Sequence, residues 1–186
     1  EFALYEARTD RRHVINWFSE SNYIREKDAY KNAQLFSRMI TENLFTYHVQ
    51  PIVETTTGNI VAYEALMRST GDLKMEPKQI LSIAANQNSL YAIEKLTFFN
   101  TMKLISENQS VFENKKLFIN SMCEYSLNDE DFNELYLTYG ELMEKCVIEI
   151  VEDSMVTPEA IDLIKKRLAF AHTQLAIDDY GTGYSN

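Results

Sequence analysis

Three short apolar runs in the second half of the chain each end on a polar side chain, and they recur at a constant interval. The runs are Leu117–Asn120, Val147–Glu149 and Leu175–Asp178, and their final residues follow one another every 29 positions. Helix signals fill the intervals between the runs. Strand, helix and strand at fixed spacing are typical of parallel βα units. The pattern predicts an α/β fold in which these runs are neighbouring parallel strands.

The helix signals between these runs are local. Asn128 precedes three acids and predicts a helix that ends at Gly140, and Pro158 opens the next helix. Apolar periodicity predicts further helices upstream. Two β-prone runs around Gly58-Asn59 predict a hairpin. The expected upstream elements are helices at 1–18, 28–43, 77–86 and 90–107 and strands at 45–53 and 60–68.

The hairpin carries two features that bear on function. Pro51 lacks an amide proton, which places its strand at the edge of a sheet. In the second strand Glu64 and Arg68 share one face with Leu66, because side chains alternate with a period of two. A charged pair on the same face as a core leucine indicates a site, and a salt bridge between Glu64 and Arg68 is the purely structural alternative.

The polar ends of the three runs predict a shared site. If the strands are parallel and in register, Asn120, Glu149 and Asp178 reach the same end of the sheet, where α/β barrels carry their chemistry. Asp178 is followed by Asp179, and burying adjacent carboxylates requires a cation to offset their repulsion. Oxygen ligands suit magnesium, manganese or calcium rather than zinc. A solvated turn after a strand is the alternative interpretation of the Asp pair.

Composition narrows the class of protein. A chain of 186 residues that is 45% hydrophobic suits one globular domain, and no apolar run approaches the ~20 residues of a membrane span. A formal net charge of −10 argues against a partner that is a DNA or RNA polymer. A small phosphorylated ligand is still compatible with a carboxylate-held metal. Two cysteines form no disulfide framework, which predicts a reducing, cytoplasmic location.

Five segments together resemble the EAL family of bacterial cyclic di-GMP phosphodiesterases, and the similarity runs from about residue 35 to the end. The segments are Tyr47–Val53, Tyr63–Arg68, Phe118–Asn120, Ile148–Glu152 and Ile177–Ser185. The resemblance implies a modified (β/α) barrel with an antiparallel first strand. About the first five strands of that barrel lie in residues 28–186. Residues 1–27 are expected to be a linker helix region, since 1–18 resemble the closing helix of a GGDEF (diguanylate cyclase-like) domain.

The resemblance also implies a role for each matching side chain. Glu64, Asn120, Glu149 and Asp178 are the implied ligands of one Mg²⁺ or Mn²⁺ ion, and Asp179 that of a second; Glu64, Asp178 and Asp179 are the implied catalytic residues. Arg68 is the implied phosphate contact and Gln50 the guanine contact. Glu152, Gly181, Gly183 and Ser185 are implied to stabilise the loop after Asp178. The implied reaction is two-metal hydrolysis of cyclic di-GMP to linear pGpG.

Departures from the family pattern leave alternatives open. Ile83–Asn86 lacks a glutamate that is common in the family, and His172–Gln174 lacks a common glycine. The family's later strands, which carry a lysine and a last metal-site glutamate, are not found in the 186 residues. We therefore expect the 186-residue chain alone to have little or no phosphodiesterase activity. A non-catalytic cyclic di-GMP receptor or protein-interaction module is the main alternative. An unrelated metal-dependent barrel would leave the Gln50-Pro51 and Gly181–Gly183 matches unexplained. A homodimer and a preceding GGDEF or sensor domain are compatible with the resemblance.

Overall fold

The strands of the described chain form one sheet in which sequence neighbours are also spatial neighbours. The computed structural model describes residues 19–70, 75–151 and 158–178. The strands are β1 (Phe45–Val53), β2 (Ile60–Ser69), β3 (Lys116–Ser121), β4 (Cys146–Val151) and β5 (Gln174–Asp178), in the order β1-β2-β3-β4-β5. Strands β1 and β2 are antiparallel, and each later pair is parallel. The predicted α/β fold with an antiparallel first strand is confirmed.

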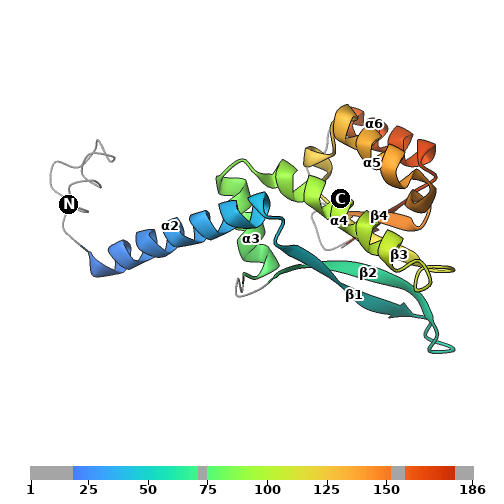
Figure 1. The fold of residues 1–186 in the computed structure, drawn as a ribbon, viewed down its shortest axis with the longest axis horizontal. Helices are drawn as coiled ribbons and strands as arrows, with labels where there is room; N and C mark the ends of the chain where they lie inside the picture. Colours follow the sequence, from blue (N-terminus) through green and yellow to red (C-terminus); the bar gives the residue numbers. More distant parts are fainter. Residues whose placement is uncertain (1–18, 71–74, 152–157, 179–186) are drawn as a thin grey trace, which may run out of the picture.

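Helices connect the parallel strands, and α4, α5 and α6 cover one face of the sheet (Figure 1). The described helices are α2 (Glu20–Thr41), which precedes β1, α3 (Pro77–Asn86), α4 (Leu90–Glu107), α5 (Asp129–Met143) and α6 (Pro158–Phe170), with a 3-10 turn, η1, at Cys123–Tyr125. Helix α4 contacts β1, β3 and α5, and α6 contacts β5. Figure 1 shows α4, α5 and α6 on the same side of the sheet, while α2 projects away from it. No described helix is long and apolar enough to cross a membrane.

The helix boundaries follow from capping residues, with one exception. The Asn128 side chain accepts a hydrogen bond from the Asp131 amide at 2.8 Å, as expected of an N-cap. The prediction that this helix ends at Gly140 is wrong, because α5 continues to Met143. Met143 is 5% exposed. Burying a methionine contributes about 1.5–3 kcal/mol, more than the ~1 kcal/mol that a helical glycine costs.

The hairpin confirms the turn and the edge position that the sequence predicts. Gly58 has a φ of +72°, a conformation that favours glycine, and its amide donates to the Glu54 carbonyl at 2.8 Å. Pro51 lies in β1, the first strand in the order of the described sheet, which is the edge position predicted from its missing amide proton. The observed strands match the expected ranges to within one residue.

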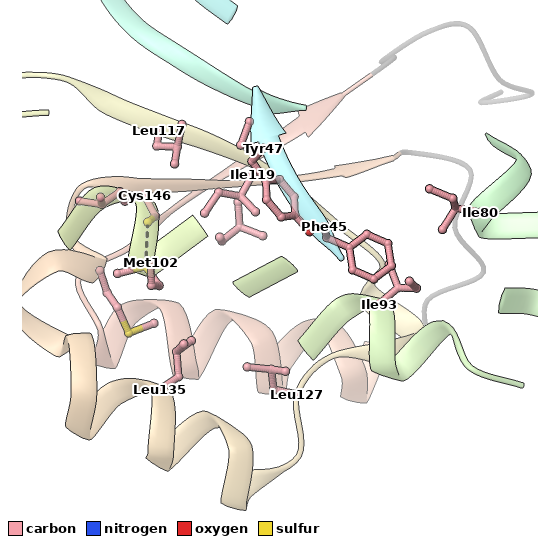
Figure 2. Close-up of a cluster of buried hydrophobic side chains, with 14 of the residues drawn as sticks. Phe45, Tyr47, Ile80, Ile93, Met102, Leu117, Ile119, Leu127, Leu135 and Cys146 are labelled. Carbon is pink, nitrogen blue, oxygen red and sulfur yellow. Dashed lines mark hydrogen bonds between the residues drawn. The ribbon is translucent and has the colours of Figure 1, made fainter. Parts of the chain in front are cut away.

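The core lies between the sheet and the helices that cover it. Leu117 and Ile119 of β3 are fully buried there, together with Leu135 of α5. Figure 2 shows these side chains with Cys146 and Met102, whose sulfur atoms lie 3.4 Å apart. Because side chains alternate along a strand, the residues between these core positions face the opposite side of the sheet. That opposite face carries the candidate functional side chains.

Two sequence expectations concern the N-terminal region. The helix predicted at 28–43 begins earlier, at Glu20, where Ser19 accepts a hydrogen bond from the Asn22 amide at 3.3 Å. The expected division at residue 27 falls inside this helix and stays a prediction. The helix expected at 1–18, with its GGDEF-like motif, lies outside the described residues.

We predict that two leucines of α5 differ sharply in their contribution to stability. Leu135 is 0% exposed and Leu137 is 85% exposed. Leu135→Ala should lower the free energy of unfolding by about 2–5 kcal/mol, because it leaves a cavity in the core. Leu137→Ala should change it by less than ~0.5 kcal/mol. Urea denaturation followed by circular dichroism measures both, and equal losses would contradict this packing.

Candidate functional site

The candidate site begins with side chains that the strand register places on one face. Glu64 pairs with Phe118, which is two residues before Asn120, and Asn120 pairs with Glu149. Paired residues share a face and side chains alternate with a period of two, so Glu64, Asn120 and Glu149 lie on the same face. The contact is direct for one pair, since the Asn120 Nδ2 donates to the Glu64 Oε1 at 3.1 Å. The structure therefore places these three side chains on one face of the sheet, and their role as a shared metal site stays a prediction.

Asp178 extends this row of acids to the last strand. Glu149 pairs with Ala176, two residues before Asp178, which places Asp178 on the same face at the end of β5. Burial, together with the negative charges of Glu64 and Asp178, raises the pKa of Glu149 to about 7. Three carboxylates therefore repel one another at this end of the sheet. Such repulsion favours either a proton or a bound cation.

The two predicted substrate contacts lie on the same face as the acids. Gln50 of β1 pairs directly with Glu64, and its side chain is exposed. Arg68 lies four residues after Glu64 near the end of β2, and its Nη1 donates to the Met67 carbonyl at 2.7 Å. Within the described part of the chain no ion pair joins Glu64 to Arg68. The salt-bridge alternative for this pair is therefore not what the structure shows.

The remaining predicted residues fall outside the described ranges. They are the second-metal ligand Asp179, the loop-stabilising Glu152, and the loop residues Gly181, Gly183 and Ser185. Their roles stay predictions. The site that can be described consequently consists of Gln50, Glu64, Arg68, Asn120, Glu149 and Asp178.

A cavity of about 310 Å³ adjoins these residues. Arg68 and Asn120 line it on the sheet side, and α4 closes it with Ile93, Glu94 and Thr97. Most of its lining is apolar, with a few polar groups from three elements. This composition is typical of small-molecule sites.

Glu94 is a buried acid that the sequence pattern did not single out. It is 1% exposed, and its Oε1 and Oε2 accept hydrogen bonds from the Ser121 hydroxyl at 2.5 Å and the Met122 amide at 3.1 Å. Burial raises its pKa to about 7. A signal was present in the sequence, because Glu94, Thr97 and Thr101 recur at helical spacing within the apolar stripe of α4.

The donor set fits a divalent ion in type and charge. Carboxylate oxygens and a side-chain amide are the ligands that magnesium and manganese prefer, and a cation would relieve the repulsion at Glu149. In residues 19–70, 75–151 and 158–178, however, no group of three or more His, Cys, Asp or Glu side chains is close enough to hold a metal ion. The acids share an edge and interact electrostatically, without forming a closed coordination sphere.

Comparison with known proteins assigns the fold. The family model described as EAL domain matches residues 33–186. An uncharacterized signaling protein of Caulobacter vibrioides is 23% identical over the whole of this chain. The FimX EAL domain of Xanthomonas citri, in complex with c-diGMP, matches 87% of this chain with a TM-score of 0.70 and 15% identity. BlrP1 of Klebsiella pneumoniae, in a manganese/cy-diGMP complex, matches 77% with a TM-score of 0.64 and 23% identity.

The matches span only part of these relatives. The chain covers 23% of the Caulobacter protein, 65% of the FimX chain and 36% of the BlrP1 chain. At these identities the structural likeness establishes the fold, and the sheet described above is the part of that fold that the chain contains.

We predict a pH-dependent stability that depends on Glu94. Its pKa rises from 4.5 to about 7 on folding, so its contribution to stability is greatest below pH 4.5 and is lost as the pH rises through 7. At 1.36 kcal/mol per pKa unit the loss is about 3 kcal/mol. Glu94→Gln should therefore become more stable relative to the unsubstituted protein between pH 4.5 and pH 8.

Urea denaturation at several pH values measures this difference. Glu130→Gln is the control, because Glu130 is exposed at the start of α5. A difference between Glu94→Gln and the unsubstituted protein that does not change with pH would contradict the prediction.

Proposed function

Because this chain belongs to the EAL-domain family, we propose that it is the first part of a barrel that binds cyclic di-GMP and, in the whole protein, hydrolyses it to linear pGpG. The observation that carries the proposal is the row of oxygen-bearing side chains on the face of the sheet opposite to α4, α5 and α6. Glu64, Asn120 and Glu149 come from three neighbouring strands. The FimX and BlrP1 structures, which share this fold, are described as complexes with the same dinucleotide.

The proposed metal ligands are the four residues that the register aligns. Glu64, Asn120, Glu149 and Asp178 would hold one Mg²⁺ or Mn²⁺ ion, with Asp179 contributing to a second. Bound divalent ions would polarise the phosphate and favour ionisation of the attacking water. Manganese in the BlrP1 complex supports this choice of metal. The acids would act through the metal, because their own negative charges repel a phosphate and only a bound cation can bring the two together.

Arg68 and Gln50 are the proposed contacts to the nucleotide. The Arg68 side chain lines the cavity beside Asn120, where its guanidinium can donate hydrogen bonds to a phosphate oxygen. Gln50 is exposed on the same face, in β1, where it pairs directly with Glu64 of β2. Its amide can donate and accept in the same plane, which suits the edge of a guanine.

A receptor that binds cyclic di-GMP without hydrolysing it is the second candidate. The observation that favours it is that no metal-holding group of acids is assembled among the described residues. Arg68 and Gln50 would serve such a receptor equally well. A homodimer and a preceding GGDEF or sensor domain stay predictions under either candidate.

We predict that the whole protein with Mg²⁺ or Mn²⁺ converts cyclic di-GMP to pGpG, and that Glu64→Gln lowers the rate by more than about a hundredfold. Partners that only orient metal ligands are worth about ten- to a hundredfold, and a ligand should be worth more. Chromatography of the nucleotides measures the conversion. Glu54→Gln is the matched control, because Glu54 is an exposed acid at the turn of the same hairpin.

Binding without conversion by the unsubstituted protein would support the receptor instead. If the protein neither binds nor converts cyclic di-GMP, both candidates are wrong. Conversion that Glu64→Gln leaves unchanged would show that the row of acids is not the site.

A further inference from the structure

Glu94 lies directly behind the end of β3, the strand that carries Asn120. Its carboxylate comes from α4 on the helix-covered side of the sheet, whereas Asn120 belongs to the opposite face. It is 1% exposed. No ion pair in the described chain includes Glu94. An acid buried at this position without a cation requires an explanation beyond packing.

The contacts of Glu94 are the two residues that follow Asn120. One carboxylate oxygen accepts the Ser121 hydroxyl at 2.5 Å, and the other accepts the Met122 amide at 3.1 Å. The ladder between β3 and β4 ends at Ser121. Glu94 therefore provides the acceptor for the first backbone amide beyond the strand, which would otherwise lack a partner at this partly buried position.

Two cavities interrupt the packing around this end of β3. One has a volume of about 310 Å³ and the other of about 50 Å³. Glu94 and Ser121 line both cavities. Where side chains are not closely packed, van der Waals contacts restrain position weakly. The two hydrogen bonds that Glu94 accepts therefore add to the β4 ladder, which pairs Ser121 with Ile150, in restraining the strand end.

This restraint reaches the candidate site through the alternation of side chains. Ser121 is held toward α4, so the preceding residue, Asn120, must project to the other face. There its amide contacts the Glu64 carboxylate at 3.1 Å. A shift or rotation of the strand end would move Asn120 away from Glu64 and separate two proposed ligands of the same metal.

We propose that Glu94 is a positioning residue that fixes the end of β3 and thereby sets the affinity of the site for its divalent metal. The inference rests on the proposed function, because Asn120 is a ligand only if the site binds metal. Glu94 itself contacts neither metal nor substrate. Its effect is on how tightly the metal is held, and the rate at saturating metal should be nearly unaffected.

The test is Mn²⁺ binding by the whole protein, measured by titration calorimetry and by the electron paramagnetic resonance of free Mn²⁺. Glu94→Gln offers one acceptor oxygen in place of two, and it removes the negative charge that strengthens both hydrogen bonds. Partners that orient ligands contribute about ten- to a hundredfold in metal affinity, and we expect a loss in this range. Ser121→Ala removes the hydroxyl that Glu94 binds and should give a smaller loss of Mn²⁺ affinity. This second variant keeps the proposal testable if Glu94→Gln does not fold.

A matched control separates positioning from general stability. Thr101 is 0% exposed on the same helix, and its hydroxyl donates to the Thr97 and Phe98 carbonyls of α4 itself. Thr101→Val should leave Mn²⁺ affinity unchanged whatever it does to the unfolding transition. Losses in the Glu94→Gln and Ser121→Ala variants should also be less than additive when combined, because both variants act on the same contact between residues 94 and 121.

The outcomes distinguish this inference from the proposed function. If Glu64→Gln loses Mn²⁺ while Glu94→Gln and Ser121→Ala bind it as tightly as the unsubstituted protein, the role of Glu94 is wrong and the metal site stands. If the unsubstituted protein binds no Mn²⁺, the metal site and the role of Glu94 both fail. An equal loss in Thr101→Val would overturn positioning in favour of a general packing effect.

Discussion

Hydrogen bonding between parallel strands in one fixed register is the constraint on which the site depends. Asn120 of β3 is paired with Glu149 of β4. Glu64 is paired with the residue two before Asn120, and Asp178 lies two residues after the partner of Glu149, so both share the face of the Asn120–Glu149 pair. A slip of one residue between any two strands would turn one of these side chains into the core. The buried side chains Leu117 and Ile119 prevent such a slip, because it would expose them.

The same register concentrates negative charge, and the fold tolerates this at a cost. The pKa of Glu149 is raised to about 7 by burial and by the charges of Glu64 and Asp178. A structure selected only for stability would place neutral side chains on this face. A bound cation would offset the repulsion, so the electrostatic cost and the proposed function have the same origin. On this face of the sheet, the acids that the proposed function needs also lower the stability of the fold.

Much of the fold was predictable because its signals are local. The glycine turn at Gly58 fixed the hairpin, and the interval of 29 residues identified the parallel strands. The end of α5 was missed because Gly140 is helical and the burial of Met143 decides the boundary. The start of α2 was missed because Tyr23 and Ile24 are 42% and 50% exposed, so no apolar stripe marks the first turns.

The site was predictable in part for a related reason. The polar residues at the ends of the apolar runs recur every 29 positions, so Asn120, Glu149 and Asp178 could be aligned from the sequence alone. Glu94 could not be assigned in this way, because its importance comes from a backbone amide 28 residues away in the chain, at Met122. Such partners are visible only when the helix and the strand are placed together. Asp179 and the residues of the following loop lie beyond what the structure describes.

The shared metal site is tested most directly by a crystal structure of the whole protein with Mn²⁺ and cyclic di-GMP, with the metal located by anomalous scattering. We predict one Mn²⁺ ion with oxygens of Glu64, Asn120, Glu149 and Asp178 at coordination distances of about 2.0–2.3 Å. A dinucleotide bound elsewhere, or a metal held by other residues with these four side chains apart, would contradict it.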